Sequence, residues 1–194
     1  MNSRPAGARD LVYGELNGNL LFIPRDRAEY LAAIHRALWS SSTWGEVRDR
    51  MPPGAYEELV AISGAAELPD FEEFYDDERR CRPRPHLTRA EARLEYLALS
   101  PHDRRPEPGD RFDAGDIGAI CDGDWPGWSE QEMLAWVPET IQQEYGHRSF
   151  SFVSGPCLMF QPDDECAIVA AFVAHGFACA RDDDLVRRAS GYGP

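Results

Sequence analysis

Five aspartates lie in a polar, glycine-containing stretch, where their carboxylates could bind a hard cation: Asp110, Asp113, Asp116, Asp122 and Asp124. Ca²⁺ and Mg²⁺ bind to several carboxylate oxygens. However, a calcium loop of the EF-hand type that begins at Asp122 would place Pro126 and Met133 where oxygen ligands are needed. Aspartate and glycine are also the usual residues of turns. The favoured interpretation is a solvated loop, and we predict no metal and no cofactor.

A cysteine and a histidine could form a second kind of reactive site. Cys121 or Cys157 with His147 would give a nucleophile beside a general base. The histidines show no i,i+4 pair and no zinc-ligand spacing to a cysteine. Free cysteines are more often small buried residues, and we expect Cys157, Cys166 and Cys179 to lie in the core. We therefore predict no catalytic residue.

Two tryptophans flank a Pro-Gly pair within an acidic segment, a composition that is typical of a binding surface. Tryptophan is enriched in binding hot spots, and acids around it would attract a basic partner. The segment predicts a partner-binding site that consists of Asp122, Asp124, Trp125, Trp128 and Glu130. In the alternative, both tryptophans fold inward as a lid. We expect Trp136, farther along, to lie in the core.

The charge of the chain excludes several kinds of partner. All 20 basic residues are arginine, and 34 acids give a formal net charge of −14. Such a field repels phosphate backbones and anionic lipids, so we predict neither nucleic-acid nor membrane binding. Without lysine, the chain also lacks the phosphate-binding lysine of the Walker motif and any Schiff-base lysine. A protein partner, itself basic, fits best.

The cysteines and the N-terminus favour a cytoplasmic protein. The five cysteines are odd in number, widely spaced and without a C-x-x-C motif. This pattern indicates reduced thiols rather than a disulfide framework. The first ten residues lack the apolar core of a signal peptide. The longest apolar run, Cys166 to Ala174, is far shorter than the ~20 residues that cross a bilayer.

The first hundred residues are rich in helix signals. Asn17-Gly18 between two apolar runs predicts a β-hairpin over residues 11–23. Apolar spacing and capping boxes at Thr43 and Thr88 then predict helices at about 26–38, after Thr43, at 55–62 and at 88–100. We expect the basic run RRCRPRP to pair with the acidic EEFYDDE before it.

The last eighty residues predict a mixture of strands and helices. A helix begins at Ser129 and a second one follows Pro138. Strands at 148–153 and 157–161, a helix at 164–175 and a strand at 177–181 form a β-β-α-β unit, which a short helix at 182–189 follows. Because the helix at 164–175 is apolar on every side, we predict that it is central and buried.

The patterns together predict an α+β fold. Its N-terminal half is helix-rich with an N-terminal β-hairpin, and its C-terminal β-β-α-β unit forms a small mixed sheet. We expect a single domain over 1–194 with two lobes, 10–100 and 115–194, joined by a connector at 101–114. The leading functional prediction is a non-enzymatic acidic domain that binds a protein, as an immunity-type or adaptor protein does. The alternatives are a small hydrolase-like enzyme that uses carboxylates or a Cys/His pair of residues 110–157, and a regulator that responds to a small ligand or metal.

Overall fold

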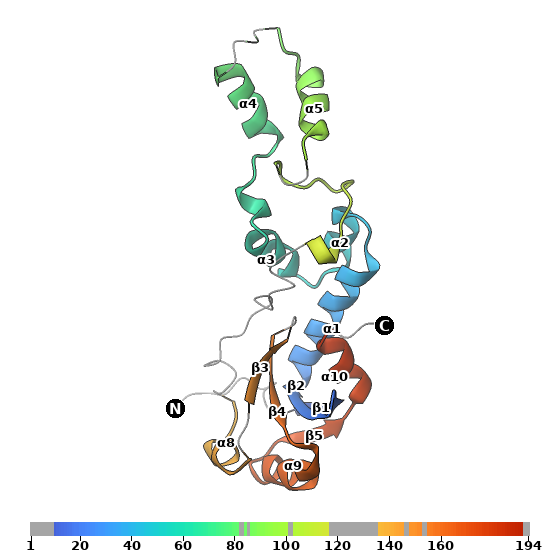
Figure 1. The fold of residues 1–194 in the computed structure, drawn as a ribbon, viewed down its shortest axis with the longest axis vertical. Coiled ribbons are helices and arrows are strands. Elements are labelled where there is room, and N and C mark those ends of the chain that lie inside the picture. Colours follow the sequence, from blue (N-terminus) through green and yellow to red (C-terminus); the bar gives the residue numbers. More distant parts are fainter. Residues whose placement is uncertain are drawn as a thin grey trace. The chain divides into compact units, whose positions relative to one another are not determined.

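The computed structural model describes residues 10–81, 84, 86–100, 103–116, 136–145, 148–152 and 155–191, and confirms the α+β fold (Figure 1). The chain contacts divide into two compact units: Met1–Ser40 with Ala114–Pro194, and Ser41–Asp113. The N-terminal hairpin therefore shares a unit with the C-terminal strands. The lobes expected from the sequence group these segments differently, and as units of folding they stay a prediction.

The first unit is built on a five-stranded mixed sheet with the strand order β3-β4-β2-β1-β5. The strands are β1 Asp10–Leu16, β2 Asn19–Pro24, β3 Arg148–Phe152, β4 Gly155–Phe160 and β5 Ala178–Arg181. Asn17 and Gly18 have φ of 53° and 75°, as a two-residue hairpin turn between β1 and β2 requires. This confirms the hairpin. Neighbouring strands are antiparallel except β1 and β5, which are parallel.

The β-β-α-β order of the C-terminal segment is confirmed, but its strands do not pair with one another throughout. The hairpin lies between them, because β4 pairs with β2 and β5 pairs with β1. The β3–β4 hairpin and the apolar helix that follows it do not determine which strand β5 pairs with. In this unit β5 pairs with the edge of β1.

Helices cover both faces of the sheet (Figure 1). Helices α1 Arg25–Ser40 and α10 Asp183–Ala189 pack on one face, against Val12, Leu21 and Ile23. The other face carries α9 Glu165–Ala174 and α8 Glu139–Tyr145, which follows Pro138 as predicted. Because side chains alternate along a strand, β1 and β2 supply apolar residues to both cores. The unit is thus a three-layer helix–sheet–helix arrangement.

The second unit is helical and contains α2 Trp44–Arg50, α3 Ala55–Ile62, α4 Phe71–Cys81 and α5 Arg89–Ala98. At the start of α5, the Thr88 hydroxyl accepts from the Glu91 N–H at 3.2 Å and the Glu91 carboxylate accepts from the Thr88 N–H at 2.9 Å. This confirms the predicted capping box. At the start of α2, Thr43 caps Glu46, but the Glu46 carboxylate accepts from the N–H of Ser42 instead.

Candidate functional site

The five residues of the predicted partner-binding site lie outside the described residues: Asp122, Asp124, Trp125, Trp128 and Glu130. The same holds for Cys121 and His147 of the alternative cysteine–histidine pair, and for the helix expected from Ser129. These sites stay predictions. Trp136, in contrast, is 7% exposed and belongs to the core, as expected.

Of the five loop aspartates, Asp110 has a structural role. Both of its oxygens accept from the guanidinium of Arg104 at 2.6 Å, and one also accepts from the N–H of Glu107. The bond from Arg104 is the main reason why the pKa of Asp110 lies below its usual value. Among the described residues, no group of three or more His, Cys, Asp or Glu side chains could hold a metal ion.

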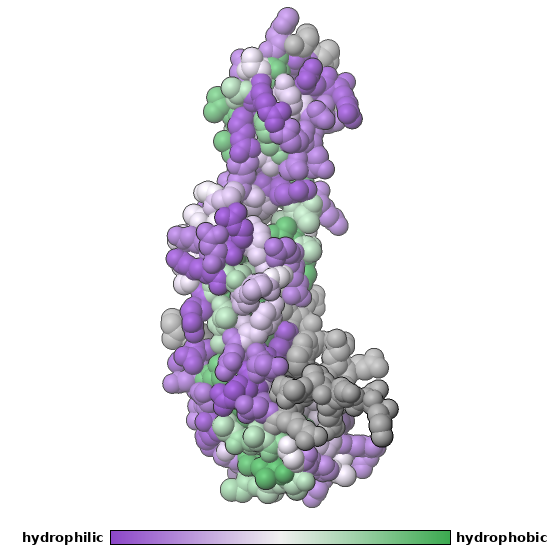
Figure 2. Space-filling view, turned by 180° about the vertical axis from the view of Figure 1, so that it is seen from behind, coloured by the Kyte–Doolittle hydropathy of each residue, from purple (hydrophilic) through white to green (hydrophobic). Residues whose placement is uncertain are grey.

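Among the described elements, helix α9 departs most from the structure predicted by the sequence. Its sequence from Cys166 to Ala174 contains no polar or charged residue except the thiol of Cys166. The sequence therefore predicted a helix buried on every side, and this prediction is wrong. Five of its residues are exposed to solvent, and we call them the α9 face: Cys166, Ala167, Ala170, Val173 and Ala174. The expectation that Cys166 lies in the core fails for the same reason. Figure 2 shows hydrophobic residues gathered over α9 at the lower end of the view.

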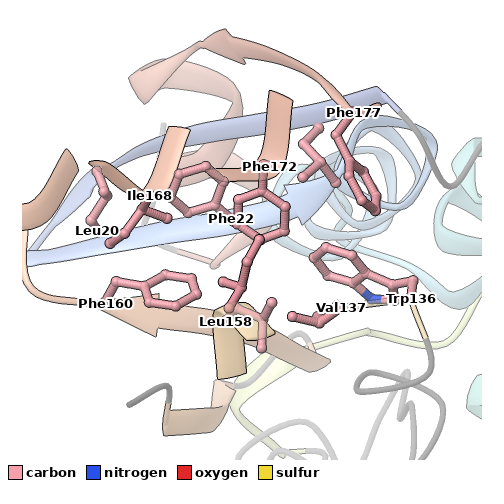
Figure 3. Packing of buried hydrophobic residues seen from close by; sticks show 11 residues of the cluster. Leu20, Phe22, Trp136, Val137, Leu158, Phe160, Ile168, Phe172 and Phe177 are labelled. Atoms are coloured by element: carbon pink, nitrogen blue, oxygen red, sulfur yellow. The ribbon is translucent and has the colours of Figure 1, made fainter. Parts of the chain in front are cut away.

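The opposite side of α9 explains why the helix has a fixed orientation. Ile168 and Phe172 are fully buried against the sheet (Figure 3). The Phe172 ring lies 5.1 Å from that of Phe22 on β2 and 5.4 Å from that of Phe177. Large residues at positions 168 and 172 can fill this core, whereas the alanines at 167, 170 and 174 cannot. The side of the helix with small residues is therefore the one left in solvent.

An ion-pair network anchors the first turn of α9. The Arg181 guanidinium on β5 donates to both oxygens of Glu165 at 2.8 and 3.0 Å, and to Asp183 at 3.0 Å. The other oxygen of Asp183 accepts from the N–H of Glu15 on β1 at 2.9 Å. The bond from Arg181 is the main cause that lowers the pKa of Asp183, and the bonds to Asp183 and Glu165 raise the pKa of Arg181. Helix α9, β5, β1 and the start of α10 are thereby held together.

The last turn of α9 is fixed by a helix stop and a side-chain contact. Gly176 adopts φ of 81°, a left-handed conformation that ends the helix. His175 Nε2 lies 2.9 Å from the hydroxyl oxygen of Thr140 on α8, so the two helices are joined at this end. Both ends of the exposed face are therefore attached to the sheet unit.

Acidic residues lie just before helix α9 in the sequence and on the neighbouring helix α8. Asp163 and Asp164 precede α9 and are exposed, and Glu139 and Glu144 are exposed on α8, which packs beside it. From Glu139 to His175 the chain has five acids and one arginine. Because its side chains are small, this apolar helix face lets the backbone of a partner approach closely. The acids favour a partner that has basic residues around its contact surface.

Comparison of the chain with protein-family models, with curated proteins and with solved structures finds no match. None of the helices among the described residues combines the length and apolar character that crossing a membrane requires. A sequence signal for the α9 face did exist: the helix has large residues at 168 and 172 and only small residues or valine at the exposed positions. The periodicity of size, rather than of polarity, marks the buried side.

Proposed function

We propose that this protein is a non-enzymatic interaction domain that binds a basic protein partner through the α9 face. One observation carries the proposal: a helix that has no charged side chain from residue 166 to 174 leaves half of its residues in solvent. A helix that is apolar all round is normally buried, and contiguous exposed apolar surface is typical of protein–protein contact sites.

The composition of the face sets the kind of contact. Val173 is 54% exposed, and the four other members of the face are small. Burial of apolar surface stabilises a complex by roughly 25 cal/mol per Å² before the entropy of association is subtracted. The net charge of −14 and the acids around α9 would speed the encounter with a basic partner. The apolar face then holds the partner, and the charges select it.

The acidic tryptophan segment is the sequence-based candidate for a second contact with the same partner. Asp122, Asp124 and Glu130 would add to the acidic rim, and Trp125 and Trp128 would add large apolar anchors. Replacement of either tryptophan by alanine should then weaken binding by about 2 kcal/mol while the fold stays intact. A loss of several kcal/mol of unfolding free energy instead would assign the tryptophans to the core.

Site-specific photo-crosslinking tests the proposal. A photoreactive amino acid at position 173, introduced in the host that makes the protein, should link to a basic protein, which is then purified and titrated by calorimetry. Val173→Glu should weaken binding roughly tenfold or more, because it puts a charge into a desolvated contact. Leu94→Glu, at an exposed apolar position of the second unit (71% exposed, against 54% for Val173), is the control and should leave the affinity unchanged.

The dependence of the affinity on salt concentration separates the electrostatic contribution to binding from the apolar one. Affinity for the partner should fall as ionic strength rises, since the acidic rim acts through a screened field. A partner that binds Val173→Glu as well as the unsubstituted chain would contradict the proposal. So would an affinity that does not depend on salt.

A further inference from the structure

A partner segment that covers the α9 face has to satisfy the hydrogen bonds of its own backbone. From Cys166 to Ala174 the helix has no polar side chain except one thiol, and its backbone groups bond within the helix. An extended segment on this face would bury the N–H and C=O groups that point toward α9 without giving them partners, which is costly. A helical segment bonds these groups internally. The α9 face therefore favours a helix over a strand or a loop as its partner.

The small side chains of the α9 face let a partner helix lie close to α9. Ala167, Ala170 and Ala174 are exposed and are spaced by three and four residues, so they lie on one side of the helix. The axes of two packed helices lie ~8–10 Å apart, according to the size of the side chains in contact. From position 166 to position 174 the face is ~12 Å long, since each residue of a helix adds ~1.5 Å. Two to three turns of a partner helix cover this length.

Helix α8 lies beside α9 and runs in the opposite direction (Figure 1). Thr140, in the first turn of α8, lies 2.9 Å from Nε2 of His175, which follows the last residue of α9. At the other end, Tyr145 is the last residue of α8. Its pKa is raised by desolvation, by Glu144 and by Asp164, in that order, so both carboxylates lie near its phenol. The end of α8 and the start of α9 therefore meet at one end of the α9 face.

The acids are concentrated at that end of the α9 face. Asp163, Asp164 and Glu144 are exposed there, and none of them forms an ion pair with an arginine in the part of the chain that the structure describes. Arg181 does not neutralise them, because the ion-pair network at the first turn of α9 already holds its guanidinium. At the opposite end, the first turn of α8 contributes Glu139. The face thus has one strongly acidic end.

These charges select one orientation of the partner helix. The macrodipole of a helix favours basic residues in its last turn and acidic residues in its first turn. A helix antiparallel to α9 places its last turn over the acidic end of the α9 face, whereas a parallel helix places its first turn there. We infer that the partner segment is an amphipathic helix that lies antiparallel to α9, with arginine or lysine in its last turn over Asp163 and Asp164. The inference rests on the proposed function, because it names the element that covers the α9 face.

Photo-crosslinks from two positions test the helix and its orientation. A photoreactive amino acid is placed at position 167, toward the acidic end, or at position 174, toward the opposite end, of the full chain in its host. Mass spectrometry of the linked partner should place the link from position 167 on the C-terminal side of the link from position 174. The two links should be about seven residues apart, because positions 167 and 174 are ~10 Å apart along α9. In an extended segment the same length corresponds to about three residues.

The outcomes of this experiment separate the inference from the proposed function. Links in the reverse order, or about three residues apart, would overturn the antiparallel helix and leave the proposed function standing. The absence of a link from both positions would overturn the proposed function, and the inference with it.

Two double variants test the acidic end. Asp163→Asn with Asp164→Asn should slow association with the crosslinked partner roughly fivefold or more, because charges at the edge of a contact steer the encounter. Circular dichroism should be unchanged, since asparagine suits a helix start as aspartate does. Glu57→Gln with Glu58→Gln removes the same charge from the first turn of α3 and is the control, which should associate at the rate of the parent. Equal rates for the two double variants would mean that only net charge attracts the partner and would overturn the inference.

Discussion

Replacement of His35 should remove an acid sensitivity that the fold builds into the first unit. His35 lies on α1, is 5% exposed, and has no hydrogen-bond partner at either ring nitrogen. A Cβ at Gly191, just beyond α10, would lie 3.0 Å from its ring, so the imidazole is enclosed between the two elements. Burial lowers its pKa from 6.5 to about 4. The folded protein therefore holds His35 neutral at pH values where the unfolded chain protonates it.

The magnitude follows from proton linkage. As the pH falls below 6.5, the unfolded state binds a proton that the folded state refuses until the pH approaches 4, so stability declines across this interval. Between pH 7 and pH 5 this one group should cost about 2 kcal/mol of unfolding free energy. His35→Leu has a similar volume and leaves no unpaired nitrogen. The unfolding free energy of His35→Leu should therefore fall by about 2 kcal/mol less than that of the parent between pH 7 and pH 5. At pH 7 it should equal or exceed that of the parent.

Urea unfolding at pH 7 and pH 5, followed by circular dichroism and tryptophan fluorescence, measures the difference. The carboxylates titrate alike in both proteins, so the change between the two pH values isolates His35. His86→Gln, at an exposed position, should behave as the parent. An NMR titration of the imidazole gives the pKa directly. A pKa near 6.5, or an equal loss of stability in His35→Leu, would refute the reasoning.

Three further substitutions, two of them with a matched control, test the packing within each unit. Gly14→Ala should cost about 1–3 kcal/mol, because the new Cβ would lie 2.9 Å from the backbone of Asp183, whereas Gly109→Ala has open space and should be neutral in thermal melts. Ala171→Leu, beside the core, should lower the unfolding free energy by about 1–3 kcal/mol, whereas Ala170→Leu, at an exposed position, should not. Equal melting midpoints for the two variants would mean that α9 is oriented differently. Arg104→Ala should lower the unfolding free energy, measured by chemical denaturation, by about 3 kcal/mol or more. The substitution removes the ion-pair partner of the largely buried Asp110 carboxylate.

Local elements were the part of the fold that the sequence predicted well. Asn17-Gly18 places the hairpin turn because these residues accept positive φ. Thr88 with Glu91 locates the start of α5 because the capping box satisfies N–H groups that the helix leaves free. The acidic and aromatic stretch DFEEFYDDE by itself predicts one or two helical turns, whereas helix α4 runs from Phe71 to Cys81. Its aromatic residues are stabilised by contact with α5, which local patterns do not report.

Non-local pairing was beyond the sequence. The bond between Glu15 and Asp183 joins residues 168 positions apart, and no local pattern specifies that β5 pairs with β1. The predicted internal pairing of the basic run is confirmed in part: Arg80 lies 3.8 Å from Asp76 and Arg84 lies 3.7 Å from Glu78, but the closest partner of Arg84 is Glu95 on α5. Flexible arginine side chains choose among acids that only the tertiary fold brings near.

The candidate surface was missed for a related reason. Polarity alone predicts burial for every side of α9, since all sides are apolar, and only the size of Ile168 and Phe172 distinguishes the core side. His35 was equally hidden from pattern analysis, because a histidine on the apolar side of α1 interrupts the pattern without indicating whether its nitrogens have partners. Burial and partnership are properties of the packed unit.

Hydrogen–deuterium exchange of the complex with the crosslinked partner tests the central claim most directly. If the α9 face is the docking surface, amides of residues 165–176 should exchange at least several-fold more slowly in the complex than in the free chain. The α4–α5 hairpin of the second unit should exchange equally in the free chain and in the complex. Unchanged exchange across α9, with protection elsewhere in the first or second unit, would contradict the account.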